Sequence, residues 1–161
     1  MTETKDTPGV IAPPPLIALA AVIIGVALDW WLPANVFTGS IPFWPRIVAG
    51  IAIALGGGAL AIAGVRQFKT IGTNVEPWKP SLRLATTGIY TRLRNPMYVG
   101  LILLVLGIGI ALASDWTLLM AVATAMMLHI GVVLREERYL ERKFGDEYRV
   151  YKARVSRWGI F

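Results

Sequence analysis

Residues 97–134 read MYVGLILLVLGIGIALA, then SD, then WTLLMAVATAMMLHIGVVL, so two apolar runs are separated only by Ser114-Asp115. At about 1.5 Å per helical residue, each run can cross most of a hydrocarbon core about 30 Å thick. With so short a connection the runs fold back on each other as a hairpin, and their polar ends meet at one membrane face. These ends are Arg94-Asn95 and residues 135–138, Arg-Glu-Glu-Arg. A charge beside hydrocarbon is costly unless it is paired or functional, so we expect a site between them.

The composition of the whole chain is that of a membrane protein. Of its 161 residues, 55% are hydrophobic and only 16% are charged, which is too apolar for an ordinary soluble domain of this size. We predict one all-α integral membrane domain, residues 1–161, with four transmembrane helices at 16–32, 47–65, 97–113 and 116–134. A proline-rich flexible tail is expected over 1–15. Two cytoplasmic segments, 66–96 and 135–161, are expected to form the site, the second as an amphipathic helix.

The basic residues indicate orientation. Six Lys and Arg lie between the second and third runs, eight follow the fourth, Lys5 precedes the first, and only Arg46 falls on the other side. The positive-inside rule then places both termini in the cytoplasm, in an inner (cytoplasmic) membrane protein. The net charge of +6 fits this topology and anionic headgroups better than nucleic acid, because no aromatic-basic binding motif accompanies it. No metal site is expected, and the absence of cysteine excludes thiolate ligands.

Two patterns predict how the helices pack. Small residues at four-residue spacing in the second run let helices approach closely in lipid; they are Gly50, Ala54 and Gly58, with Gly57 and Ala61 beside them. After the fourth run, apolar and aromatic residues recur at helical spacing, namely Leu140, Phe144, Tyr148, Tyr151 and Val155. We expect this second face to pack over the 66–96 loop and roof a pocket.

The polar block before the hairpin suits an anionic ligand. Pro96 is well placed in the first turn of a helix, and Asn95 before it can cap that helix. The helix N-terminus offers free N–H groups and a positive dipole end to a carboxylate or another anion. Tyr90 and Tyr98 add hydroxyls and rings, and a ring attracts a cation by about 0.5–2 kcal/mol.

Glu136 and Glu137 end the hairpin and supply negative charge. The side chains of adjacent residues point about 100° apart on a helix, so Glu136 and Glu137 should have different functions. They are acceptors for an amino group or for ribose hydroxyls. The alternative is a charge cluster at headgroup level that merely ends the helix.

A series of short motifs surrounds the hairpin over residues 66–161: Gly72-Thr73, Thr87-Gly88-Ile89-Tyr90, residues 94–100 (RNPMYVG), Glu136-Glu137, Phe144-Gly145, Tyr148, Tyr151 and Val155. Their order resembles the isoprenylcysteine carboxyl methyltransferase family and the related phospholipid methyltransferases. The resemblance implies a small helical membrane enzyme that takes S-adenosyl-L-methionine from the cytoplasm and methylates a lipid-like acceptor from the bilayer. The cofactor contacts it implies fall on Leu82, Arg83, Leu84, Ala85, Tyr90, Asn95, Pro96, Met97, Tyr98 and Glu136.

The residues that would contact the methyl acceptor are less clearly indicated by the sequence. Methyl transfer from a sulfonium needs no protein nucleophile or metal, but an amine acceptor must lose a proton, and Glu137 or His129 is a candidate base. His129 lies seven residues before Glu136, so both are expected on one helix face; the alternative for His129 is a buried imidazole hydrogen-bonded across the bundle. Asn95 and Val132 stand where the eukaryotic prenylcysteine enzymes have His and Arg, which leaves the acceptor, and oxygen against nitrogen methylation, open. A non-catalytic lipid-binding or helper protein with the same fold is the rival prediction.

Overall fold

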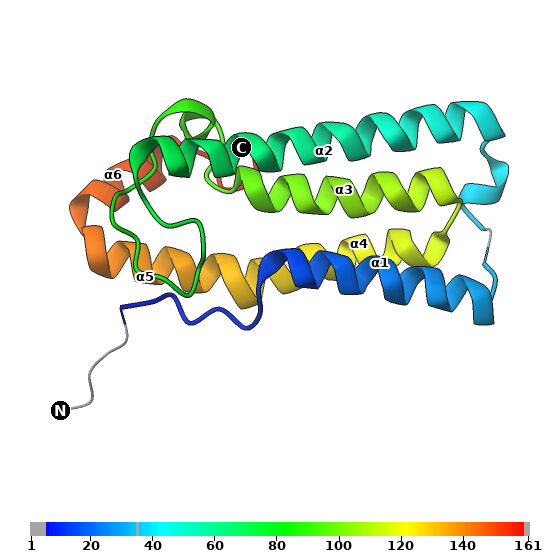
Figure 1. Cartoon of the computed structure of the whole chain (residues 1–161), viewed down its shortest axis with the longest axis horizontal. Helices are drawn as coiled ribbons and strands as arrows, with labels where there is room; N and C mark the ends of the chain where they lie inside the picture. Colours follow the sequence, from blue (N-terminus) through cyan, green and yellow to red (C-terminus); the bar gives the residue numbers. More distant parts are fainter. Residues whose placement is uncertain (1–5, 35, 160–161) are drawn as a thin grey trace.

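The computed structural model describes residues 6–34 and 36–159, and within these ranges the chain is helical and contains no strand, as predicted. The long helical runs lie side by side in Figure 1. They are α1 (Pro14–Trp31), α2 (Phe43–Ile71), α3 (Pro96–Leu112) and a continuous run of α4 (Asp115–Leu128), the π-helical turn η3 (His129–Val133) and α5 (Leu134–Phe144). The shorter elements are the 3₁₀ turns η1 (Thr38–Ser40) and η2 (Gly88–Thr91) and the final helix α6 (Asp146–Arg154).

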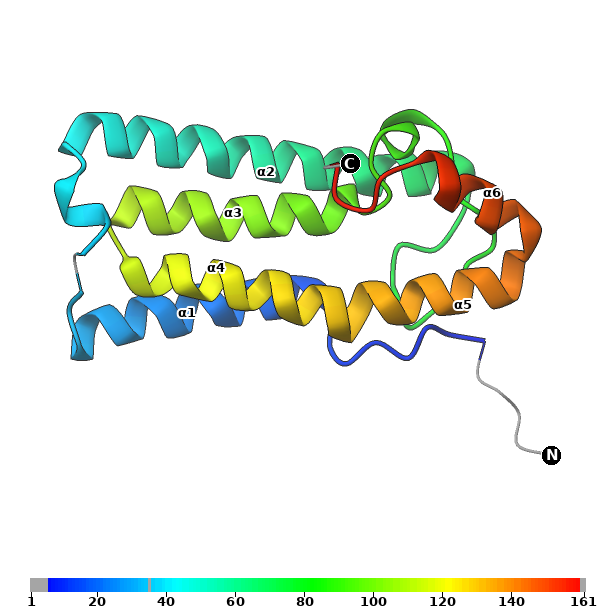
Figure 2. The same ribbon diagram turned by 180° about the vertical axis from the view of Figure 1, so that it is seen from behind.

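Three of these runs are long and apolar enough to cross a membrane: α1, α2 and Asp115–Phe144. The fourth predicted span, α3, is apolar but has 17 residues, and it lies alongside the others in both views (Figures 1 and 2). Four spans therefore stay a prediction. Helix α2 exceeds its expected apolar run, since it begins directly after Pro42 and ends where Gly72 takes a left-handed conformation, φ 70°.

A row of glycines brings α2 and α3 together. Gly50, Gly57 and Gly64 are buried at seven-residue spacing on α2. A Cβ at Gly57 would lie 2.6 Å from the carbonyl oxygen of Gly100, so the backbones touch where a side chain has no room. Gly58, which the four-residue pattern placed in this interface, has open space where its Cβ would be.

At one end of the bundle, here called the loop end, the carboxylate of Asp115 anchors the connection between α1 and α2. It accepts hydrogen bonds from the backbone N–H groups of Val36, Phe37 and Thr38, the last two at 3.0 Å. Trp116 adds a bond from its indole nitrogen to the carbonyl of Leu32, at 2.7 Å. The turn between α3 and α4 is thereby tied to the connection opposite it.

At the other end, here called the site end, residues 6–13 lie along η3 and α5. The backbone N–H of Ile11 donates to the carbonyl of Gly131 at 3.2 Å, and Arg135 Nη1 donates to the carbonyl of Gly9 at 2.8 Å. The Asp6 carboxylate accepts from Tyr139 Oη at 2.9 Å. This differs from the flexible tail expected over 1–15, because α5 offers the segment donors that the tail's own composition does not reveal. Residues 1–5 lie outside the described residues.

The helices form two tightly packed pairs. α2 packs on α3, and α1 packs on α4; α3 and α4 join the pairs through their hairpin, while α1 and α2 flank α3 with little direct contact between them. A buried cluster fills the junction at the site end, formed by Ile17, Tyr98, Leu128, Val132 and Val133. This arrangement leaves one face of α3 open between α1 and α2.

Candidate active site

A cavity opens at the site end, between the 72–95 loop, the start of α3, and α5 with α6. It encloses about 780 Å³, counting its open mouth. All five tyrosines of the chain line it: Tyr90, Tyr98, Tyr139, Tyr148 and Tyr151. Aromatic rings carry a negative face, so a cavity with this lining suits a cationic ligand.

Tyr98 and Glu136 join the two predicted polar ends. Tyr98 lies in the first turn of α3, and its hydroxyl donates to Glu136 Oε1 at 2.6 Å. This distance lies within the ordinary range of an O–H···O hydrogen bond. The hairpin therefore does bring its ends together, and this pair forms one wall of the cavity.

The π-helical turn η3 decides which side chains of the fourth run face the cavity. A π turn holds more residues than an α turn, so the helical phase changes between His129 and Glu136 and the seven-residue rule fails. Glu136 faces Tyr98, whereas the ring of His129 lies 5.9 Å from that of Trp158 and does not line the cavity. His129 Nδ1 is buried and has no hydrogen-bond partner among the described residues.

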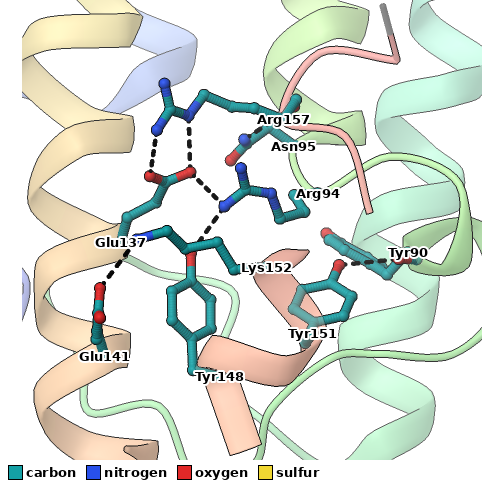
Figure 3. Close-up of polar contacts among 9 residues, drawn as sticks. All are labelled: Tyr90, Arg94, Asn95, Glu137, Glu141, Tyr148, Tyr151, Lys152 and Arg157. Atoms are coloured by element: carbon teal, nitrogen blue, oxygen red, sulfur yellow. Dashed lines mark hydrogen bonds and ion pairs between the residues drawn. The ribbon is translucent and has the colours of Figure 1, made fainter. Parts of the chain in front are cut away.

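Glu137 lies between two arginines (Figure 3). Arg157 holds it with two bonds, Nε to Oε1 at 2.8 Å and Nη2 to Oε2 at 2.7 Å, and Arg94 Nη1 donates to Oε1 at 2.8 Å. Burial, and secondly the nearby Glu137 charge, raises the pKa of the adjacent Tyr148 hydroxyl to about 12. Both carboxylate oxygens are engaged, which makes Glu137 a poor acceptor for a substrate proton.

The hydroxyl of Thr73 shapes the loop before α3. It accepts hydrogen bonds from the backbone N–H groups of Leu82, at 2.9 Å, and Arg83, at 3.2 Å. The segment that follows, Arg83 to Ala85, lines the cavity, while the side chain of Leu82 is exposed. Thr73 therefore contributes to the cavity indirectly, by fixing the conformation of the loop that lines it.

Helix α6 covers the cavity with Tyr148 and Tyr151; the single amphipathic helix expected over 135–161 is instead divided at Gly145 into α5 and α6. Tyr151 Oη donates to the carbonyl of Tyr90 at 2.8 Å, which fixes α6 on η2. The Tyr90 hydroxyl is itself buried and has no partner among the described residues, although Tyr90 lines the cavity. Burial raises the pKa of this hydroxyl far above its usual range, so it stays a protonated donor.

Most of the predicted cofactor residues meet at this cavity: Arg83, Leu84, Ala85, Tyr90, Asn95, Met97, Tyr98 and Glu136. Leu82 and Pro96 are outside its lining. Asn95 precedes α3 without the expected side-chain cap; its Nδ2 donates instead to the carbonyl of Arg157 at 3.1 Å. Sequence reasoning gave no role to Arg94 or Arg157. Arg94 could have been recognised because it stands directly beside the predicted site residue Asn95. No local sequence pattern marks Arg157.

The fold and the cavity define an apolar helical bundle with a tyrosine-lined cavity at one end, and comparison with known proteins shows its family. Residues 45–147 match the phospholipid methyltransferase family, and the chain belongs to that family. The predicted resemblance is thereby confirmed.

Two relatives show how far the likeness extends. An uncharacterised protein of Haemophilus influenzae is 40% identical over 62 residues, 38% of this chain and 98% of that protein. Methanethiol S-methyltransferase 1 of Bradyrhizobium diazoefficiens is 40% identical over 74 residues, 46% of this chain and 25% of that protein. The chain thus spans only a quarter of the second relative. No solved structure matches the chain significantly.

Proposed function

We propose that the protein is an S-adenosyl-L-methionine-dependent methyltransferase that methylates a lipid-like acceptor at the cytoplasmic face of the membrane. The observation that carries this proposal is the cavity that combines five tyrosines, the Glu136 carboxylate and a buried, unpartnered hydroxyl on Tyr90. Family membership supports methyl transfer in general. The identity of the cofactor, the identity of the acceptor and the side of the membrane go beyond what family membership supports, and we propose them here.

The lining residues fit the chemistry of this cofactor. Its sulfonium is a cation, which aromatic rings favour, and its amino and ribose hydroxyl groups need acceptors such as Glu136. A buried donor without a partner is unfavourable unless a ligand completes it, and Tyr90 Oη is such a donor. The start of α3, with Asn95 and Met97 in the lining, offers a positive helix end for a carboxylate.

A second cavity supports an acceptor that comes from the bilayer. It encloses about 600 Å³ between the start of α1, α2 and α3, on the open face of α3. Its lining is almost wholly apolar and includes Pro14, Ala61, Val65, Trp78 and Leu101. It shares Met97 and Tyr98 with the first cavity, so a hydrocarbon chain in this groove would end beside the cofactor residues.

When bound, S-adenosyl-L-methionine supplies a methyl group on sulfur, and transfer needs an acceptor lone pair aligned with that carbon. The chain's residues orient the reactants and exclude water: Tyr148 and Tyr151 cover the cavity, and residues of the groove keep its approach dry. Of the two predicted bases, Glu137 is ion-paired and His129 lies outside both linings. An acceptor that arrives deprotonated, such as a carboxylate or a thiolate, suits this arrangement better than an ammonium.

Calorimetry with S-adenosylhomocysteine on the purified full-length protein tests the cofactor. We expect binding that weakens in Tyr98→Phe and Glu136→Ala and is unchanged in Leu82→Ala, whose side chain is exposed. A wild-type protein that unfolds cooperatively but binds no S-adenosylhomocysteine would overturn the proposal. Binding unchanged by Tyr98→Phe and Glu136→Ala would favour the non-catalytic rival.

Incubation of the protein with methyl-labelled cofactor and native membranes tests the acceptor. A labelled species in the lipid extract is the expected result. Methanethiol is supplied in a parallel reaction, because the Bradyrhizobium relative is named for that acceptor. Label in methanethiol and none in lipid would contradict the lipid acceptor while keeping methyl transfer.

A further inference from the structure

The C-terminal segment, residues 155–159, crosses the start of α3. The backbone N–H of Arg94 donates to the carbonyl of Ser156 at 2.9 Å, and Asn95 Nδ2 donates to the carbonyl of Arg157 at 3.1 Å. Arg94 and Asn95 line the cavity, whereas residues 155–159 lie behind them. The segment is therefore placed to set the position of the polar residues before α3.

Glu137 fastens this segment to α5. Its side chain is 10% exposed, and its two oxygens accept one bond from Arg94 and two from Arg157 (Figure 3). The hydrogen bonds to Glu137 raise the pKa of the Arg157 guanidinium, which stays charged. A two-bond guanidinium–carboxylate pair fixes direction as well as distance. One buried carboxylate thus links α5, the residue before Asn95 and the C-terminal segment.

We propose that Glu137 and Arg157 are a positioning pair, which clamps the C-terminal segment onto α5 and so holds Arg94 and Asn95 in the shape that binds the cofactor. The proposal rests on the proposed function for its ligand and assigns Glu137 a role other than proton transfer. Removing Glu137 leaves Arg94 and Arg157 without a carboxylate, and removing Arg157 leaves Glu137 paired with Arg94 but no longer joined to the C-terminal segment. Either change releases the segment, so loss of one partner should disturb the cavity as much as loss of both.

Four variants and one control test the pair by cofactor affinity and rate. Glu137→Gln and Arg157→Ala are each expected to weaken S-adenosylhomocysteine binding by about tenfold. The double variant should weaken it no further, and Arg157→Lys, which keeps the charge but loses the two-bond geometry, should fall between. Arg154→Ala changes an exposed arginine three residues away and should bind as the wild type does. If Glu137 were instead a base, Glu137→Gln would lower the rate at saturating cofactor and leave cofactor affinity unchanged. Arg157→Ala would then change neither the rate nor the affinity. That pattern overturns the clamp.

A second measurement does not depend on the cofactor. Because the chain has no cysteine, Val155→Cys gives a single thiol in the partly buried start of the segment. Its reaction with a maleimide in the folded protein should be at least fivefold faster when Glu137→Gln or Arg157→Ala is added, and unchanged with Arg154→Ala. An equal labelling rate in all backgrounds refutes the clamp even if the cofactor binds. Faster labelling in a protein that binds no S-adenosylhomocysteine supports the clamp and refutes the proposed function instead.

Discussion

The hydroxyls of Tyr90 and Tyr98 lie in the same cavity and differ in hydrogen bonding. Tyr98 donates to Glu136, while Tyr90 has no partner among the described residues. A hydroxyl with a protein partner contributes to folding as well as to binding. One that is buried without a partner opposes folding of the unbound protein and becomes favourable only when a ligand accepts its hydrogen bond.

Tyr90→Phe separates these two effects. The unbound protein should be as stable as the wild type or more stable by up to about 1–3 kcal/mol, because no bond is lost and an unpartnered donor is no longer buried. Affinity for S-adenosylhomocysteine should fall about fivefold, in line with one neutral hydrogen bond. The raised pKa keeps the hydroxyl protonated at and above pH 9, so the difference from the wild type should be constant between about pH 6 and pH 9.

Thermal unfolding and calorimetry check this prediction, with Tyr98→Phe as the matched comparison that loses stability and affinity together. A Tyr90→Phe protein that is clearly less stable but binds the ligand as before would show that the hydroxyl has a structural partner.

At the scale of single elements, the spacing of glycines separates the interface from the lipid-facing side of α2. Gly57 touches the α3 backbone, and its neighbour Gly58 faces open space. Gly57→Ala forces α2 and α3 apart and should destabilise the protein by about 1–3 kcal/mol. Gly58→Ala should be neutral or stabilise by up to about 1 kcal/mol, since alanine is the better helix former.

Both variants are compared by thermal unfolding in the same detergent. Equal effects at the two positions would contradict the close approach of α2 and α3 at Gly57.

The predicted membrane helices could be recognised because each contains an uninterrupted apolar run. The meeting of Tyr98 with Glu136 followed from the short turn between two such runs. The features that could not be predicted depend on the rotational phase of a helix or on contacts between residues that are distant in sequence. A single π turn rotates Glu136 relative to His129, and nothing in HIGVV marks it in the sequence. Arg157 reaches Glu137 through a chain reversal after Gly145, so the pairing has no periodic signature.

At the scale of the molecule, the groove between α1 and α2 should serve the acceptor and not the cofactor. Val65→Phe adds bulk to the groove lining, whereas Ile62→Phe adds it to an exposed position one turn away on α2. The first change should lower methyl transfer to membrane lipid about tenfold with S-adenosylhomocysteine affinity unchanged, and the second should alter neither. Equal transfer rates in the two variants would exclude the groove as the route of the acceptor.

The predicted orientation has a direct test in a chain without cysteine. Ser40→Cys lies exposed at the loop end and Glu147→Cys lies exposed at the site end. In intact cells a membrane-impermeant maleimide should label the first and reach the second only after lysis, as the positive-inside rule requires. The opposite labelling would reverse the topology and place the candidate active site outside the cytoplasm.

The tie that Asp115 makes at the loop end joins the connection between α1 and α2 to the turn between α3 and α4. The pair α1–α4 and the pair α2–α3 are joined there, and α1, with 18 residues, is a lever about 27 Å long. A change of about 5° in the angle between the pairs would therefore displace the far end of α1 by roughly 2 Å. The bonds from Tyr98 to Glu136 and from Arg94 to Glu137 join the two helix pairs at the site end, so a change in the angle between the pairs would alter the proposed acceptor groove and the proposed cofactor cavity together.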